Sequence, residues 1–539
     1  MTGGISAADL RLFLPELILG ATVVALCLAD TIMPPTKSRR EPLGVLALLG
    51  IALSFWAVQS SGAELASAFY GKVAIDPLGN FFKVVFLAIA ALTVFTSAFS
   101  TELPRRNFGE YYTLLLAITF GMFLMAGAND LLIAYLGIEM VSIVSFAMVG
   151  FRLRNKRSSE AALKYVIFGG AASGVMLFGL SLLYGLFGHT DLTAIHHSLV
   201  QWGATSFESS ISGAGEVFPL TLLVAITFIF AGIGYKIAVV PFHMWSPDVY
   251  EGAPTPFTAF LSVGPKAAGF ALLIRMIVGV FVPAGGEGGF LAEDGFLEFP
   301  LNLPIPAMLG FVAAITMTFG NLAAIPQNNV KRLLAYSSIA HAGYLLMGFV
   351  VLSQTALQAV MIYIVFYYLM NVGAFTICQA VRDKTGGEML SDFSGLGGRE
   401  PWMAILMTIF LVSLTGLPPV AGFIGKFYLF YAVIEHGGMG FWALAIIAAL
   451  NSAISLFYYF KIVKAMWLVE PAETGPMGLH KGYVAIASIL AVPTLIYGLY
   501  WTPVSSAAKD SIAIYRSPIV QQLTQAETSR SQSAIAERQ

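Results

Sequence analysis

The feature that most constrains the fold of this chain is a succession of apolar runs separated by short polar gaps. A helix needs about 20 apolar residues to cross a bilayer, and about fourteen runs meet this requirement. Of the 539 residues, 57% are hydrophobic and 11% are charged, whereas soluble domains carry about 25% charged residues. Because only helices and closed barrels satisfy their backbone groups in lipid, the sequence predicts an all-α polytopic membrane protein with about fourteen transmembrane helices.

Two of the runs are interrupted by proline, one in each half of the chain. The run 219–240 leads into Pro241, and the run 401–434 is broken at 416–419. We therefore predict that helices 7 and 12 are discontinuous, as in transporters built from inverted repeats. An odd number of spans in each repeat would invert the second copy. The expected segments are an N-terminal three-helix segment (1–110), a first five-helix repeat (111–282), a second, inverted five-helix repeat (303–467), a C-terminal helix (484–502) and a mobile, exposed polar tail (503–539).

Lysine and arginine gather in alternate loops, which orients the spans by the positive-inside rule. Both termini are then expected to face outside, consistent with an even number of spans. The residues that indicate the inner side are Lys37, Arg39, Arg40, Arg105, Arg106, Arg152, Arg154, Lys156, Arg157, Lys331, Arg332, Arg382, Lys384, Arg399, Lys461, Lys464 and Lys481.

Composition also excludes several classes of function. The net charge of −1 gives no indication of a nucleic-acid partner. The two cysteines, Cys27 and Cys378, are far apart and lie in apolar runs, so we expect buried residues rather than metal or cluster ligands. No glycine-rich phosphate-binding loop is present, and no metal site is expected.

Glu139 lies inside the apolar run NDLLIAYLGIEMVSIVSFAMVGF. A carboxylate at the centre of a membrane helix costs about 2.5–3.5 kcal/mol, so it needs a partner or a hydrated cavity. Lys164 belongs to the next run, across the basic loop 152–157. We predict that Glu139 and Lys164 pair, either as a pair that opens and closes with the local proton count or as a static structural ion pair.

Three further lysines lie inside apolar runs, each close to proline: Lys236 before Pro241, Lys266 directly after Pro265, and Lys426 seven residues after Pro419. Proline removes a backbone donor and opens room for water within a helix. Lysine exchanges its proton readily when it is buried. The pattern therefore predicts a hydrated route for protons at mid-membrane depth.

Three more residues are secondary candidates. His243, in PFHMWSPDVYEGAPTP, could relay protons or simply bond a backbone carbonyl. Lys331 opens a run at the inner side, where it either anchors the span or takes part in charge movement. His341 lies ten residues further, about 15 Å deeper if the segment is helical, with Ser337 and Ser338 one turn before it.

Four motifs in order along the chain carry a family resemblance. YLGIEMVSIVSFAMVGF, GYKIAVVPFHMWSPDVYEGAPTP, NNVKRLLAYSSIAHAGYLLMG and LTGLPPVAGFIGKFYLF resemble the antiporter-like membrane subunits of proton-pumping NADH:quinone oxidoreductase, respiratory complex I. Within that family the likeness is greatest to the subunit N branch, since Lys426 stands where the M-type has glutamate and no long lateral helix follows.

The resemblance implies a role in an enzyme complex. The chain would be a subunit of the translocating oxidoreductase without a redox centre or cofactor of its own. NAD, FMN, iron–sulfur clusters and quinone would belong to partner subunits of the complex, and other membrane-arm subunits, including antiporter-like ones, would be its neighbours. The location implied is an energy-transducing membrane, the bacterial inner membrane.

The resemblance also assigns roles to the residues singled out above. Glu139 and Lys164 would form the inward-side charge pair, and Lys236 would be the central lysine. Lys266, with His341 near it, would continue the axis toward Lys426.

Two alternatives stay open. The chain could be a subunit of a multisubunit Na⁺(K⁺)/H⁺ antiporter, which shares this fold and many of these motifs. It could also be a structural scaffold whose buried charges only pair with one another.

Overall fold

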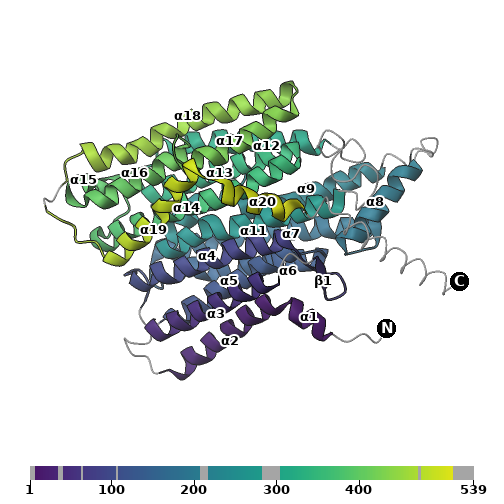
Figure 1. The fold of residues 1–539 in the computed structure, drawn as a ribbon, viewed down its shortest axis with the longest axis horizontal. Coiled ribbons are helices and arrows are strands. Elements are labelled where there is room, and N and C mark those ends of the chain that lie inside the picture. Colours follow the sequence, from purple (N-terminus) through teal and green to yellow (C-terminus); the bar gives the residue numbers. More distant parts are fainter. Residues whose placement is uncertain are drawn as a thin grey trace.

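The computed structural model describes residues 6–33, 40–61, 65–104, 107–206, 217–281, 304–471 and 475–513, which form a bundle of long helices (Figure 1). Within these ranges, thirteen helices are long and apolar enough to cross a membrane. A further crossing is made by two shorter helices in sequence, α16 (Pro401–Thr415) and α17 (Ala421–His436). The predicted all-α membrane fold with about fourteen spans is confirmed.

Helices follow one another through the described ranges, which contain a single short β-hairpin near the N-terminus. The first half contains α1 (Ala7–Leu12), α2 (Leu14–Ile32), α3 (Arg40–Ser60), β1 (Ala66–Ala68), β2 (Val73–Ile75), α4 (Pro77–Phe99), α5 (Phe108–Gly127), α6 (Leu131–Val149), α7 (Lys156–Phe187), α8 (Leu192–Ser206), α9 (Val217–Ile237), α10 (Ser246–Gly252) and α11 (Thr255–Phe281). The second half contains α12 (Ile305–Ala324), α13 (Val330–Val351), α14 (Gln354–Thr385), η3 (Leu390–Phe393), α15 (Leu396–Arg399), α16, α17, α18 (Met439–Leu468), α19 (Lys481–Leu499) and α20 (Thr502–Ala513).

Three helices form the interior of the bundle. α11, α13 and α14 are almost wholly buried by the rest of the chain, whereas α2 and α3 lie along one edge and α18 along the opposite edge (Figure 1). Close approach uses small residues, as is usual in membranes. At Gly320 a side chain would meet the backbone nitrogen of Ala340 at 2.6 Å, so α12 and α13 touch through their backbones. Three of the predicted site residues, Lys266, Lys331 and His341, lie on these interior helices.

Both predicted interruptions are present. α9 ends at Ile237, and the chain turns through Ala238 (φ +61°) and Pro241 before α10 begins. α16 ends at Thr415, and Gly416 takes φ +85° before α17 begins. The prediction that helices 7 and 12 are discontinuous is therefore correct, whereas the division into two inverted repeats remains a prediction.

The end of the bundle that carries α15 and the loops rich in lysine and arginine is called the basic end below, and it lies at the left of Figure 1. The short antiparallel hairpin β1–β2 and the helix α8 lie at the opposite end (Figure 1). Lys37, Arg39, Arg105 and Arg106, which contribute to the predicted orientation, lie outside the described residues.

Two expectations differ from the structure. Residues 503–513 form most of α20, whose Ala508 and Ile512 are buried and whose Ser505 accepts a hydrogen bond from Gln358, so the tail is not exposed from residue 503. An apolar spacing at 504, 508 and 512 gives this segment a face to bury. Residues 514–539 lie outside the described residues. Of the two cysteines, Cys378 is buried as expected but Cys27 is exposed on this chain.

Candidate functional site: a mid-membrane lysine row and a basic-end network

Lys236 is held in the last turn of α9, directly before the break. Its Nζ donates to Ser142 Oγ on α6 over 2.8 Å, and only 1% of the residue is exposed. The lysine stem lies against Gly269 of α11, where an added Cβ would be 3.3 Å from Lys236 Cγ. Gly269 is one turn from Lys266, so the stem of Lys236 packs against the helix that carries Lys266.

Lys266 follows Pro265 inside α11 and reaches across to α13. Its Nζ donates to Ser338 Oγ over 2.6 Å and to the Ser338 carbonyl over 3.1 Å. The ring of Tyr250, on α10, lies 5.9 Å from the same ammonium. A cation over an aromatic face is favourable when it is desolvated.

His341 lies one turn beyond Ser338 on α13 and is bonded at both ring nitrogens. Nδ1 is 2.6 Å from the Tyr363 hydroxyl, and Nε2 is 3.1 Å from the Tyr459 hydroxyl. Tyr344 follows on the next turn, with its ring 6.0 Å from the imidazole. A histidine with a partner on each nitrogen can take a proton at one and release it from the other.

Lys426 completes the series on α17. Its Nζ donates to the Thr415 carbonyl over 2.8 Å and to Ser452 Oγ over 3.0 Å, and it lies 4.6 Å from the Tyr344 ring centre. The Thr415 carbonyl is free to accept because α16 ends there. A Cβ at Gly416 would lie 2.7 Å from Lys426 Cδ, so glycine makes room for this stem.

Lys266, His341 and Lys426 are linked through α13, and Lys236 packs on the helix that carries Lys266. These four residues are called the lysine row below. Within the described residues, none of its three lysines has a carboxylate within ion-pair distance. Their partners are hydroxyls, backbone carbonyls and aromatic rings.

The predicted Glu139–Lys164 pair is wrong for this structure. Glu139 accepts a hydrogen bond from Ser173 of α7, whereas Lys164 binds Asp248 at 2.7 Å and Glu160 at 2.8 Å. Ser173 is nine residues beyond Lys164 on one helix, which places it about 13 Å deeper. That separation exceeds the length of a lysine side chain. Glu139 instead lies one turn from Ser142, the partner of Lys236.

His243 is buried after the break but is not bonded to the lysine row. Its ring packs on Phe319 at 4.4 Å, and its Nδ1 has no hydrogen-bond partner within the described ranges. His243 therefore does not bond a backbone carbonyl of the described residues through Nδ1, and the alternative role as a proton relay stays a prediction.

Lys331 is not a surface anchor. It is fully buried and donates to the Ala253 carbonyl over 2.8 Å and to Glu388 over 3.1 Å. Burial at a basic end is possible here because Glu388, from the segment after α14, provides the counter-charge.

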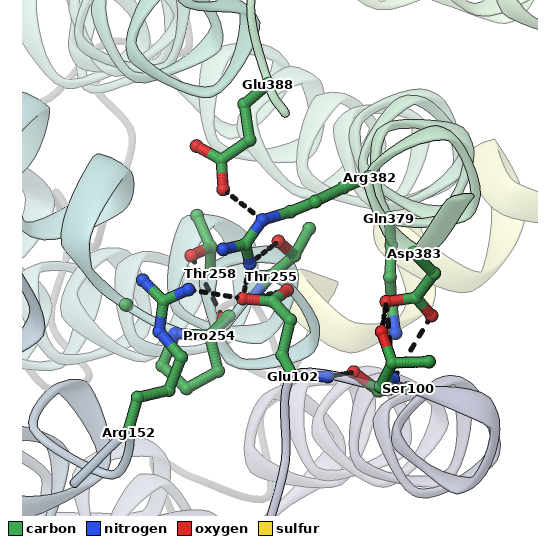
Figure 2. Close-up of polar contacts among 12 residues, drawn as sticks. Ser100, Glu102, Arg152, Pro254, Thr255, Thr258, Gln379, Arg382, Asp383 and Glu388 are labelled. Atoms are coloured by element: carbon green, nitrogen blue, oxygen red, sulfur yellow. Dashed lines mark hydrogen bonds and ion pairs between the residues drawn. The ribbon is translucent and has the colours of Figure 1, made fainter. Parts of the chain in front are cut away.

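Lys331 belongs to a set of interleaved ion pairs that sequence reasoning missed, called the basic-end network below. Figure 2 shows the other members of this network, which are Glu102, Arg152, Arg382 and Glu388. Glu102 is paired with both Arg152, at 2.9 Å, and Arg382, and its second oxygen accepts from the Thr255 backbone. Arg382 also contacts Glu388 at 2.7 Å. The members are Glu102, Arg152, Lys331, Arg382 and Glu388.

The cations of the network stabilise the ionised form of Glu388. Burial raises the pKa of Glu388, but Lys331 and Arg382 outweigh that effect and hold the pKa below its ordinary value. The network joins the α4–α5, α6–α7 and α10–α11 connections to the ends of α13 and α14. Its residues come from loops that are far apart in the sequence, so no local motif could have revealed it.

Two more buried ion pairs lie near the opposite end. Lys83 of α4 binds Glu16 of α2 at 2.6 Å, and Arg275 of α11 pairs with Asp76, the residue that caps α4. The first pair joins two N-terminal helices to each other, and the second joins the start of α4 to the interior helix α11. Sequence reasoning did not single out Glu16, Lys83 or Asp76.

The family model described as "NADH:quinone oxidoreductase/Mrp antiporter, TM" matches residues 128–286 and 295–455. These residues contain the whole lysine row. The chain belongs to this family.

Relatives within the NADH:quinone oxidoreductase/Mrp antiporter family extend the match over nearly the full chain. NADH-quinone oxidoreductase subunit N of Anaeromyxobacter sp. (strain Fw109-5) is 47% identical over 512 residues, covering 94% of this chain and 96% of that protein. Subunit N 2 of Sorangium cellulosum (strain So ce56) is 44% identical, covering 95% and 99%. The likeness to subunit N that the motifs indicated is confirmed.

Solved structures agree with the fold. A chain of respiratory complex I from Thermus thermophilus with bound aureothin gives a TM-score of 0.73 at 30% identity, covering 92% of this chain and 100% of that one. A chain of the Mrp complex from Dietzia sp. DQ12-45-1b gives 0.75 at 20% identity, covering 95% and 98%, which shows a shared fold alone. The chain is therefore a multi-pass membrane subunit of this family.

Proposed function

We propose that this chain is a proton-translocating membrane subunit of an NADH:quinone oxidoreductase. Protons move along the lysine row, with Glu139 at one end of the row near Lys236, and their movement is coupled to quinone reduction in other subunits. NAD, FMN, iron–sulfur clusters and quinone belong to those partners, among them further antiporter-like subunits of the membrane arm. The basic end faces the inside of a bacterial inner membrane, with both termini outside.

The proposal rests on the kind of hydrogen-bond partner that the lysines of the row have. An ammonium at mid-membrane depth is costly, and a carboxylate partner would fix it in its charged form. Lys236, Lys266 and Lys426 have hydroxyl and carbonyl partners instead. Those groups accept from the ammonium, and a serine hydroxyl can also donate to the neutral amine. Each lysine can therefore exist in both protonation states without losing its neighbours.

Charge then moves in steps between neighbouring groups. A proton that reaches Lys266 leaves through Ser338 and passes to His341, which takes it at one ring nitrogen while the other releases one. Lys426 receives charge at the far end, beside Tyr344. A charge at one position disfavours a like charge at the next, so each step biases its neighbours and couples distant sites.

The test uses the assembled enzyme complex reconstituted into vesicles, with NADH-driven proton transport measured beside NADH oxidation. We expect Lys236→Ala and Glu139→Ala to assemble normally but to lose most coupled transport. Arg11→Ala, an exposed residue of the N-terminal helix α1, is the matched control and should behave as wild type. Wild-type pumping by an assembled Lys236→Ala complex would contradict the proposal.

The fold shared with the Mrp complex chain supports one second candidate, a subunit of a multisubunit Na⁺(K⁺)/H⁺ antiporter. The two candidate functions differ in the subunits with which the chain assembles. Purification with NADH-oxidising subunits supports the oxidoreductase, whereas purification with cation-exchange activity and no NADH oxidation supports the antiporter.

A further inference from the structure

A charged cavity opens at the basic end, between α7, α10 and α13. It has a volume of about 170 Å³, which gives room for several water molecules. Nearly all of its lining is charged, with both signs represented. The lining side chains are Arg157, Glu160, Lys164, Asp248, Glu251 and Arg332, with Ala161 and Gly252.

Asp248 binds cations from two of these helices at once. Its two carboxylate oxygens bind Lys164 of α7 at 2.7 Å and Arg332 of α13 at 2.5 Å. Arg332 also binds Glu251 at 3.1 Å, and Arg157 approaches Glu251 at 3.9 Å. The charged groups that face Asp248 are therefore Lys164, Glu160 and Arg157 from α7, Arg332 from α13, and Glu251 from its own helix.

The other face of α10 belongs to the lysine row. Tyr250, two residues after Asp248, is completely buried, and its ring lies 5.9 Å from Lys266 Nζ. Its hydroxyl is 3.4 Å from Ser338 Oγ, the group that binds Lys266. One short helix thus separates a charged cavity with room for several water molecules from Tyr250 and Ser338, the buried groups that contact Lys266.

Further hydrogen bonds hold α10 and the residues that flank it in place. The Gly252 carbonyl accepts from Arg152 over 2.8 Å, and the Ala253 carbonyl accepts from Lys331 over 2.8 Å. Trp245, at the start of α10, donates to the Tyr235 carbonyl over 2.9 Å. Because Asp248 bonds to both α7 and α13, loss of one of its ion pairs removes one of the links that hold α10.

We propose that the cavity is the proton-uptake site for the lysine row, that Asp248 is the carboxylate which takes up the proton there, and that α10 is the gate between them. This inference rests on the proposed function. When Lys164 moves away from Asp248, the carboxylate loses a counter-charge and accepts a proton from cavity water. The hydroxide left behind is neutralised from the inner aqueous phase. The proton then passes α10 toward Tyr250, Ser338 and Lys266.

The experiment compares proton transport by the assembled complex in vesicles over a range of pH. Asp248→Asn should lower the transport rate by about tenfold or more at alkaline pH, where protons are scarce. The loss should be smaller at acidic pH, and Asp248→Glu should restore transport. Glu110→Gln, which changes an exposed carboxylate near the start of α5 outside the cavity, is the control and should keep the wild-type profile.

The outcomes separate this inference from the proposed function. If Lys236→Ala loses proton transport but Asp248→Asn keeps the wild-type pH profile of transport, the uptake site alone is overturned. Normal transport in Lys236→Ala overturns both. An equal loss at every pH in Asp248→Asn indicates a structural clamp and also overturns the uptake role.

If Asp248→Asn does not assemble, Lys164→Gln provides the same test, because it removes a counter-charge and keeps the carboxylate. Its transport profile should extend to higher pH. An unshifted profile overturns the inference.

Discussion

The lysine row and the basic-end network hold similar numbers of buried cations in opposite ways. In the network, Arg152, Lys331 and Arg382 each contact a carboxylate. In the row, Lys236, Lys266 and Lys426 contact hydroxyls and carbonyls. A carboxylate partner stabilises one charge state, whereas a hydroxyl accommodates two. The difference in partners is the basis for our proposal that the network maintains the structure and the row moves charge.

Replacement of Lys266 by arginine tests this distinction most strongly. Arginine keeps the positive charge but does not release its proton in proteins. Lys266→Arg should therefore reduce coupled proton transport by about tenfold or more while the complex assembles, as expected for a lost acid–base group. The measurement is NADH-driven transport in vesicles beside subunit content on a native gel.

The matching exchange in the network is Arg382→Lys. It keeps the charge beside Glu102 and Glu388 and should leave transport within about twofold of wild type, although thermal stability falls because the planar contact is lost. If both exchanges reduced transport equally, the row and the network would not differ in function.

Removal of a network carboxylate should affect stability before transport. Glu102→Gln leaves Arg152 and Arg382 with less counter-charge, and breaking a buried pair costs about 3–5 kcal/mol. We expect a lower thermal midpoint for the detergent-solubilised complex, with the ratio of protons to NADH retained in the molecules that stay folded. A changed ratio at unchanged stability would contradict this division of roles.

The network should also respond to acid. The pKa of Glu388 is lower in the folded chain than its ordinary value of 4.5, so its contribution to stability is present above that value. It is lost as the pH falls through the folded-state pKa. Glu388→Gln should therefore be less stable than wild type at neutral pH, and the difference should shrink in acid. Thermal midpoints measured over a pH series check this sign.

The smallest effect is expected from Ser142→Ala. This change removes the hydroxyl that accepts from Lys236, a bond worth about 1 kcal/mol or about fivefold in rate. Transport should slow without stopping, because backbone groups and water can take over. Complete loss would mean that the hydroxyl itself carries the proton at this step.

Much of the molecule could be predicted from the sequence, since hydropathy and proline are local signals. They located the spans, both helix breaks and the row lysines. The partner of Lys164 could not be predicted, because Asp248 is 84 residues away and reaches α7 only through the fold of α10. The network was missed for the same reason. Helix α20 was missed because its apolar positions are few and lie in a polar segment.

Two glycines lie beside the stems of row lysines. A Cβ at Gly269 would lie 3.3 Å from Lys236 Cγ and 2.6 Å from Ile237 Cγ2, and a Cβ at Gly416 would lie 2.7 Å from Lys426 Cδ, so a side chain at either position would force a shift. These two glycines act as spacers that fix how far each ammonium can extend. The spacing of the ammonium groups therefore depends partly on residues that can never bind a proton. Substitution of either glycine should slow charge transfer along the row although no titratable group is changed.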